Sequence, residues 1–115
     1  MKVFNLRSFL IGKLRRLSYM SPVRKEVKAR ARMDRGIYQC ELCKKRLHNG
    51  EYALDHIEPV VSVTRGFVDW NEFISKLFVD ASGLQLLCKD CHSRKTKQEN
   101  ITRRKNYDRK KTRRR

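Results

Sequence analysis

The clearest apolar pattern in the chain lies between residues 69 and 78. Large apolar side chains recur there at positions i, i+3, i+4, i+7 and i+8, the spacing of one face of an α-helix: Trp70, Phe73, Ile74, Leu77 and Phe78. Asp69 precedes this stripe and Glu72 follows it by three residues, which is a capping-box signature of a helix start. The segment therefore predicts a helix that packs its apolar face on the core.

Two more helices are predicted near the N-terminus, both rich in basic residues. Residues 3–17 place apolar and basic side chains at an imperfect helical spacing that Gly12 interrupts. We expect a strap that packs on the core or on DNA, with a membrane-surface helix as the alternative. Ser21 and Pro22 are typical of a helix start, and the second helix is expected to run to about Asp34. Its mostly Lys and Arg faces fit either a solvated helix or one that lies along phosphates.

Strand signals follow in the middle of the chain. The segment Tyr52–Val61 (YALDHIEPVV) has the pattern of a half-buried strand that ends in a turn at Pro59. Asn49-Gly50, just before it, is a strong signal for a two-residue hairpin turn. His48 is therefore expected in that turn and not on a metal.

The last part of the chain is predicted as a turn at Gly83, a short strand over residues 84–87 and a helix. This helix is expected to run from Asp90 to about Asn100. The residues beyond it have no apolar periodicity, so we expect residues 101–115 to be disordered without a partner.

The charge of the chain is large and unevenly distributed. The net charge of the 115 residues is +17, with +9 over residues 1–40, −2 over 41–93 and +10 over 94–115. Basic arms favour a polyanion, and double-stranded DNA is the expected partner. A solvated tail is the alternative for the C-terminal run. We divide the chain into a basic N-terminal strap and helix (1–35), a central domain (36–100) and a basic tail (101–115).

Composition indicates that the core needs support. With 39% hydrophobic and 36% charged residues, the chain has little apolar material for a core. We therefore expect a staple, meaning a cross-link that stabilises the fold. No secretory signal and no stretch near the ~20 apolar residues of a membrane span is visible. We therefore expect a cytoplasmic protein without a membrane partner. In a reducing compartment, four cysteines favour metal ligands over disulfides.

Two cysteine pairs have the spacing of zinc knuckles. Cys40-x-x-Cys43 and Cys88-x-x-Cys91 have 44 residues between them. Two such pairs can complete a tetrahedral Cys₄ site for Zn²⁺ that has no open coordination position. The pattern predicts a structural zinc that fixes the hairpin to the last helix. Two disulfides or a redox pair are the alternatives.

The candidates for chemistry inside this zinc frame are Asp55 and His56 on the predicted strand and His92 at the start of the last helix. Adjacent strand residues point to opposite faces, so Asp55 and His56 share one site only if the strand bends near Pro59. Asp and His suit Mg²⁺, Mn²⁺ or Ni²⁺, and a second imidazole suits a general base at neutral pH. The alternative is that Asp55 and His56 satisfy each other in a tight turn.

Taken in order, these motifs resemble the zinc-containing HNH endonucleases, in particular the small versions carried by bacteriophages. The resemblance covers roughly residues 36–98 and rests on Cys40-x-x-Cys43, Asp55-His56-Ile57-x-Pro59 and Leu84-Gln85-x-Leu87-Cys88-x-x-Cys91-His92-x-x-Lys95-Thr96. It implies an α+β fold: a ββα-metal (HNH, His-Me finger) core with a structural Cys₄ zinc and flanking basic helices.

The resemblance also implies an enzymatic activity and roles for particular residues. His56 would be the general base that activates water, and Asp55 and His92 would hold a catalytic Mg²⁺, Mn²⁺ or Ni²⁺. We expect nicking or cleavage of duplex DNA with low sequence specificity, leaving 5′-phosphate and 3′-hydroxyl ends. If the chain is phage-borne, it would act in the host cytoplasm, with a phage or host protein as a further partner.

Basic residues of the last helix and the tail are expected to bind DNA. Lys95 lies one turn after His92 on the same helix face and is expected to meet a phosphate. The other candidates are Arg94, Lys97, Arg103 and Arg104. Glu99, two turns beyond His92, could add a weak carboxylate to the metal, although a solvated surface Glu is the favoured interpretation.

One position departs from the HNH pattern. The family's central Asn lies nine residues ahead of the last His, and Gly83 replaces it here. Glycine keeps the backbone freedom of a turn but lacks the side chain that would orient the base. Asn71, Asp80 and Ser82 are candidate substitutes. A zinc-stapled nucleic-acid- or protein-binding module without catalysis is therefore the alternative function, and a structural or ribosomal zinc protein is a weaker third.

Overall fold

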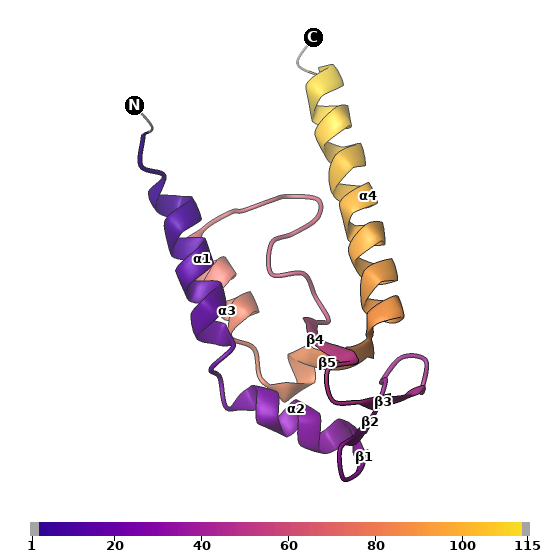
Figure 1. Ribbon diagram of the computed structural model, residues 1–115. Coiled ribbons are helices and arrows are strands. Elements are labelled where there is room, and N and C mark those ends of the chain that lie inside the picture. Colours follow the sequence, from indigo (N-terminus) through magenta and orange to yellow (C-terminus); the bar gives the residue numbers. More distant parts are fainter. Residues whose placement is uncertain (1–2, 114–115) are drawn as a thin grey trace.

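The protein has an α+β structure built on two small antiparallel sheets (Figure 1). The computed structural model describes residues 3–113. The elements in chain order are α1 (Leu6–Ser18), α2 (Val23–Ala31), β1 (Arg32–Asp34), β2 (Ile37–Gln39), β3 (Arg46–His48), β4 (Tyr52–His56), α3 (Trp70–Leu77), the 3₁₀ turn η1 (Ala81–Gly83), β5 (Leu84–Cys88) and α4 (Lys89–Arg113). Helices α1 and α4 rise from the same side of the sheets as two arms (Figure 1).

The two sheets are formed by different sets of strands. One sheet has the order β1-β2-β3, and the other pairs β4 with β5. In the second sheet Tyr52 lies opposite Cys88 and His56 lies opposite Leu84, without a break in register. Because α4 begins directly after β5, the antiparallel pair leads into the helix as a β–β–α arrangement, with α3 and η1 inserted between β4 and β5.

The predicted hairpin at Asn49-Gly50 was wrong. A turn does form there, with Gly50 at φ 87° and the Glu51 N–H donating to the His48 carbonyl at 3.1 Å. However, this turn connects β3 to β4, and these strands belong to different sheets. Strand β3 pairs with β2 instead, because residues 40–45 form the true connection between two paired strands. His48 is the exposed last residue of β3.

The second helix is shorter than the sequence pattern predicts. Its start agrees with the expectation, since the Ser21 hydroxyl accepts from the Val23 N–H at 3.3 Å. The expected end near Asp34 was wrong, because α2 ends at Ala31 and Arg32–Asp34 forms β1. Pairing with β2 opposite Tyr38 gives these residues an alternative to helical hydrogen bonds.

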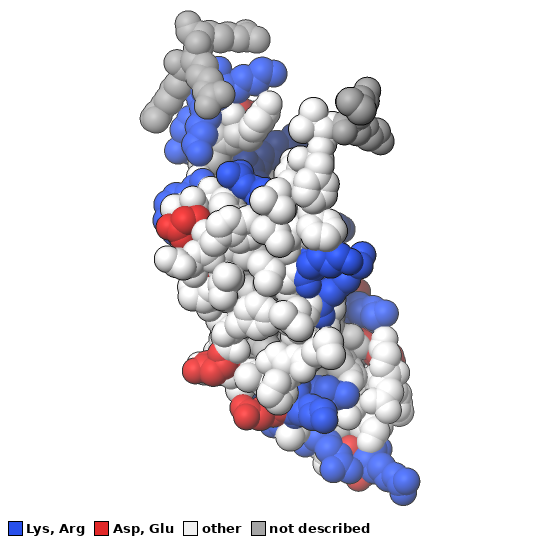
Figure 2. Space-filling view, turned by 90° about the vertical axis from the view of Figure 1, so that its left-hand side faces the viewer, with Lys and Arg blue, Asp and Glu red and all other residues white. Residues whose placement is uncertain are grey.

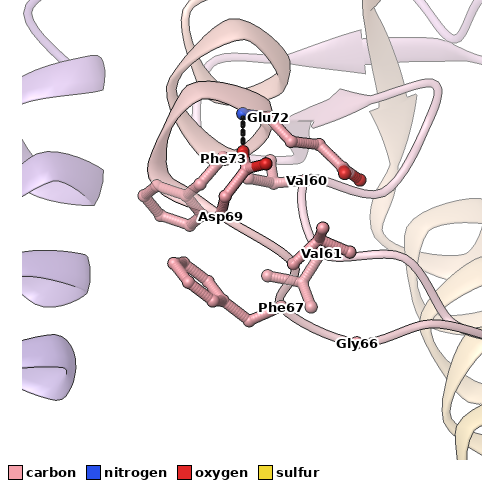
Figure 3. A pocket seen from close by; sticks show the side chains of 8 residues that line it. Val60, Val61, Gly66, Phe67, Asp69, Glu72 and Phe73 are labelled. Carbon is pink, nitrogen blue, oxygen red and sulfur yellow. Dashed lines mark hydrogen bonds between the residues drawn. The ribbon is translucent and has the colours of Figure 1, made fainter.

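Helix α3 confirms the predicted cap but only part of the predicted stripe. Asp69 caps it by accepting from the Glu72 N–H at 2.8 Å (Figure 3). Phe73 and Leu77 are buried, whereas Ile74 and Phe78 are 43% and 38% exposed. The apolar face is therefore wider than the surface that covers it.

Two apolar clusters hold the elements together. The main cluster lies between α2, the sheets and the start of α4, and its buried members are Val27, Ala31, Cys40, Leu47, Leu84, Leu86, Leu87, Cys88 and Cys91. The smaller one is formed by Val60, Phe73 and Leu77, with Val61 and Phe67 packed against them (Figure 3). Ile11 and Leu14 of α1 also join the smaller cluster, so the N-terminal strap packs on the core.

The last helix is much longer than expected. Helix α4 runs as 25 residues from Lys89 to Arg113, about 37 Å at 1.5 Å per residue. The expected end near Asn100 was wrong, and so was the expected disorder for residues 101–113. Residues 114–115 lie outside the described part. Good helix formers such as Lys, Arg and Gln sustain an exposed helix without an apolar stripe. The division into three parts at 35 and 100 stays a prediction.

The outer side of α1 and α3 carries exposed apolar residues. The largest on these two helices are Leu6, Phe9, Leu17 and Ile74, each at least 43% exposed. Figure 2, which views the molecule from this side, shows a broad area without charged side chains and Lys and Arg gathered above and below it. None of the described helices combines the length and the apolar character that crossing a membrane would need.

Candidate functional site

Four cysteines from two distant parts of the chain meet at one point. The sulfur atoms of Cys40, Cys43, Cys88 and Cys91 all lie within 4.8 Å of one another. The Cys43 and Cys88 sulfurs are 3.8 Å apart, which is the separation expected for two thiolates about 2.3 Å from one tetrahedral Zn²⁺. This cluster could bind a metal such as zinc, and its donor set is the one that structural zinc sites use.

Local backbone structure places each cysteine pair. Cys40 follows β2, and the chain turns so that the Cys43 N–H donates to the Cys40 sulfur at 3.4 Å. Lys44 closes this turn with a positive φ of 68°. In the second pair, Cys88 ends β5 and the Cys91 N–H in the first turn of α4 donates to the Cys88 sulfur at 3.3 Å. The cluster therefore joins the two sheets to α4.

The pKa values of two thiols in the cluster are shifted in opposite directions. Burial alone would raise the pKa of Cys40, but N–H groups of Cys43, Cys88 and Leu42 stabilise its thiolate and lower the pKa to about 6. A hydrogen bond with the Cys88 side chain, together with burial and the other two sulfurs, raises the pKa of Cys91 to about 12. A divalent cation would favour the thiolate form of every sulfur it binds.

Asp55 lies on the face of β4 that is turned toward α4. One carboxylate oxygen accepts from the Lys95 ammonium group at 2.9 Å and from the Gln85 amide at 3.4 Å. The other carboxylate oxygen lies 3.8 Å from Nε2 of His92. The structure thus brings together two of the residues expected at the catalytic metal. The Asp55 side chain is 15% exposed and that of His92 is 40% exposed.

No third ligand completes this pair among residues 3–113. The four cysteines are the one group of three or more Cys, His, Asp or Glu side chains there whose donor atoms lie close enough to share an ion. Glu99 points its carboxylate at the Lys95 ammonium group instead, at 3.3 Å. Asp55 and His92 at 3.8 Å still fit two ligands of one ion, because ligands at ~2.1 Å from a metal are at most ~4.2 Å apart.

His56 lies on the opposite side of β4 from Asp55. Its Nε2 is 2.8 Å from the carbonyl oxygen of Leu77, at the end of α3. A carbonyl oxygen only accepts, so Nε2 carries the proton and Nδ1 of the neutral ring keeps its lone pair. The strand does not bend between the two residues. Asp55 and His56 have different partners, so the interpretation in which they satisfy each other was wrong.

Asp55 and His56 nevertheless line one solvent-accessible hollow of about 140 Å³. Its other walls come from three parts of the chain: Arg15 of α1; Pro59, Val60 and Val61 of the loop after β4; and Lys95, Glu99 and Arg103 of α4. The hollow therefore lies between the two arms, with the strand at one side of it.

The basic residues expected on DNA differ in their surroundings. Arg94, Lys97 and Arg104 are exposed on α4. Arg103 is half-buried and donates to the Val61 carbonyl at 2.8 Å. Lys95 is not free for a phosphate, since it donates to Asp55, Glu99 and the carbonyl of His56, the last at 3.0 Å.

Gly83, at the position of the family's Asn, is in close contact with its surroundings. A Cβ atom there would lie 2.7 Å from Cβ of Val79, so the site has no room for a larger residue. The Gly83 carbonyl accepts from the Ile57 N–H at 3.0 Å, which ties this turn to the residue after His56. Of the candidate substitutes, Asn71 is exposed on α3, and Ser82 donates to Asp80.

Two functional contacts were missed from the sequence. The partner of His56 is the backbone carbonyl of Leu77, for which no side chain could have given a signal. Arg15 reaches the hollow from α1, and its position only becomes evident once α1 is packed on α3. A helical pattern with Leu14 turned inward would have placed Arg15 beside the core, but not beside Asp55.

Comparisons with known proteins give no relative for this chain. No protein-family model, no curated protein and no solved structure matches it.

Proposed function

We propose that the chain is a metal-dependent endonuclease that hydrolyses DNA phosphodiester bonds, with β4, β5 and α4 as an HNH-type ββα unit. One observation carries the proposal: an imidazole with a fixed proton lines the same hollow as a carboxylate that is paired with a second imidazole. These residues are His56, Asp55 and His92.

His56 is suited to act as the general base. With Nε2 donating to the Leu77 carbonyl, the lone pair of Nδ1 can take a proton from water. The backbone carbonyl also stabilises the protonated ring after the transfer, because both ring nitrogens then donate. Histidine is the side chain best suited to this exchange near neutral pH.

Asp55 and His92 would hold the divalent ion, and their oxygen and nitrogen donors suit Mg²⁺, Mn²⁺ or Ni²⁺. When bound, such an ion supplies charge stabilisation for the phosphorane-like transition state and for the leaving 3′ oxygen. Two protein ligands leave coordination positions for water and phosphate oxygens. For the carboxylate to bind an ion, Lys95 must release part of its hold on Asp55.

The basic arms support nucleic acid as the substrate. Residues 94–115 carry a net charge of +10, and α1 carries Arg7, Lys13, Arg15 and Arg16 without an acidic residue. Charge of this kind binds phosphates without reading bases. The proposed enzyme therefore acts on duplex DNA with low sequence specificity.

Cleavage of supercoiled plasmid with Mg²⁺, Mn²⁺ or Ni²⁺ tests this function. We expect nicking by the zinc-loaded wild type and a loss of about 10²–10⁴-fold in rate for His56→Ala, since general base catalysis contributes that much. His48→Ala is the matched control, because His48 is exposed on β3 and should leave nicking unchanged. Absence of nicking by a folded, zinc-loaded wild type with all three ions would refute the proposal.

Lys95 favours a second candidate function, that of a zinc-stapled DNA-binding module without catalysis. Its ammonium group already supplies the positive charge beside Asp55 that a metal would supply. The two candidates differ in one observable, a second metal site that does not involve cysteine. Titration of Mn²⁺ into zinc-loaded protein should show one site that Asp55→Asn removes if the chain is a nuclease, and no such site if it only binds.

A further inference from the structure

We propose that Arg15 of α1 and Arg103 of α4 form a phosphate-binding pair that grips the nucleic-acid backbone on either side of the hollow that Asp55 and His56 line. This inference deepens the proposed function and rests on it for the kind of substrate. It assigns the N-terminal arm a direct part in substrate binding. The expected ligand is a phosphodiester group next to the one at the catalytic residues.

The first reason is the charge balance of the hollow. Its lining contains three cationic side chains, Arg15, Lys95 and Arg103, and two anionic ones, Asp55 and Glu99. Both carboxylates are bonded to Lys95. The two arginines therefore leave an excess of positive charge in the hollow.

The second reason is that neither arginine has an acidic partner. Other arginines of the protein do, since Arg30 pairs with Glu41 and Arg65 pairs with Glu72, each at 2.9 Å. Within the described part of the chain, no ion pair involves Arg15 or Arg103, although Glu99 lines the same hollow. A guanidinium group beside an open hollow, with donors to spare, is suited to phosphate.

The third reason is that neighbouring residues position both arginines: Ser18 holds the main chain of Arg15, and the loop after β4 holds the side chain of Arg103. Ser18 is buried and its hydroxyl donates to the Arg15 carbonyl at 2.6 Å. The Arg15 guanidinium carbon lies 5.9 Å from the centre of the Phe73 ring, in the cluster that anchors α1. Arg103 uses one of its five N–H donors on the Val61 carbonyl. The remaining donors are held near the hollow at a small cost in side-chain entropy.

The loop between the arginines is backed by apolar packing. Val60 and Val61 line the hollow and also pack with Phe67 and Phe73 on the other side of the loop (Figure 3). This wall is not free to collapse into the hollow. The volume of about 140 Å³ holds several waters, which phosphate oxygens can displace.

The chain offers a matched control for each arginine. Arg16 and Arg104 are the next residues on the same helices, are exposed, and do not line the hollow, so each measures the general attraction of its helix for DNA, including the phosphate contact expected of Arg104. We would compare Arg15→Gln with Arg16→Gln and Arg103→Gln with Arg104→Gln. Each pair has the same charge change, so general attraction to DNA is subtracted.

The readout is binding of a fluorescein-labelled DNA duplex in EDTA-free buffer without catalytic metal, followed by anisotropy over a range of salt concentrations. We expect Arg15→Gln and Arg103→Gln to weaken binding about 10-fold and to lower the salt slope by about 0.9 each. The controls should weaken binding less than about 3-fold. Equal losses for the two members of each pair would overturn the inference.

Folding and catalysis are read separately. Zinc content and Tm of each variant are measured first, and if Arg103→Gln lowers Tm through its bond to Val61, the Arg15 and Arg16 pair decides alone. If the wild type fails to nick plasmid with any ion while Arg15→Gln selectively loses DNA binding, the proposed nuclease function falls and the phosphate pair stands. If the wild type nicks plasmid and each hollow-lining arginine variant binds DNA as its control does, the nuclease function stands and the phosphate pair falls.

Discussion

At the scale of single residues, Lys95 is held by several partners beside Asp55 and His56. Its ammonium group has three kinds of acceptor, the carboxylates of Asp55 and Glu99 and the carbonyl of His56. Only 22% of its side chain is exposed. Lys95 therefore holds β4 to α4 in the absence of an ion, and it competes with any ion that binds Asp55.

We predict that Lys95→Met has opposite effects on stability and on ion binding. The free energy of unfolding should fall by about 1–2 kcal/mol, because two half-buried carboxylates lose a charged hydrogen-bond donor. The affinity for Mn²⁺ should rise, since the ion no longer competes with an ammonium group. Thermal unfolding of zinc-loaded protein with and without Mn²⁺ measures both effects.

The exposed Lys97, two residues further along α4, gives the control for that experiment. Lys97→Met should change neither the unfolding temperature nor its response to Mn²⁺. A Lys95→Met variant that Mn²⁺ stabilises no more than the wild type would show that the two cations do not share Asp55.

Some contacts of individual residues could be predicted and others could not. The contact between Asp55 and His92 could be predicted, because the cysteine motifs join the strand that carries Asp55 to the helix that carries His92. The predicted phosphate contact of Lys95 did not anticipate that two carboxylates would hold the ammonium group. Those contacts depend on the distance between β4 and α4, which no local pattern specifies.

At the scale of elements, the turn around η1 explains why glycine occupies position 83. The turn passes so close to Val79 that any Cβ would overlap it. The backbone of Gly83 still clamps the residue after His56 through the Ile57 N–H. The clamp that the family's Asn would provide by side chain is thus partly replaced by a main-chain contact.

We predict that Gly83→Asn, which introduces the residue of the HNH pattern, destabilises this protein. Overpacking against Val79 should lower the free energy of unfolding by about 1–3 kcal/mol. In a Val79→Gly background, which removes the Cβ atom 2.7 Å away, the cost of the same change should be at least about 1 kcal/mol smaller. Urea unfolding of the four proteins in this cycle measures the difference, and an unchanged cost would mean that Val79 is not the obstacle.

The cysteine cluster is the other element-scale feature with a direct test. Chelation of zinc, or Cys43→Ser, should abolish cooperative unfolding, because Cys40, Cys88 and Cys91 form part of the main core and the four-cysteine cluster joins both sheets to α4. Circular dichroism and zinc analysis follow the change. Zn²⁺ should restore the signal after chelation and Mg²⁺ should not; retention of the fold without zinc would contradict a structural role.

Element boundaries were predictable where the signal is local. Asp69 and Glu72 predict the cap of α3, and the hydrogen bond from the Glu72 N–H to Asp69 confirms it. The end of α2 and the partner of β3 depend on which strands meet, and those pairings compete with helix and turn propensities. The full length of α4 was missed because helix propensity without an apolar stripe resembles a solvated tail.

At the scale of the whole molecule, the two arms and the hollow between them form the surface on which we propose that DNA binds. The end of α4 extends far past its last tertiary contacts, which Arg103 and Asn106 make with the Val61 and Val63 carbonyls. The residues beyond 106 add six Lys or Arg side chains and a single acid. For the described residues 107–112, no hydrogen bond or ion pair to another element is present, so we expect their contribution to be electrostatic.

We predict that truncation after Asn106 weakens DNA binding without affecting the fold. The free energy of unfolding should change by less than about 0.5 kcal/mol, as for surface changes in general. The salt dependence of DNA binding should become less steep, by about 0.9 for each phosphate that the shortened helix no longer neutralises. Truncation after Thr102 is the comparison: it also removes the bonds to Val61 and Val63, so it should lower Tm. Equal Tm values for the two truncations would contradict this assignment.

The hydrogen bond between His56 and the Leu77 carbonyl has a consequence for how this protein would look in a mutational scan. Every amino acid at position 77 brings the same oxygen atom, so alanine substitution would report Leu77 as a packing residue and leave its hold on the base invisible. Only a change of the main chain, such as an ester in place of the amide between Leu77 and Phe78, would weaken that acceptor. The same change would remove the Phe78 N–H that closes α3 on Ile74. The surroundings of His56, the proposed general base, are thus partly made by the main chain, which side-chain substitutions do not change.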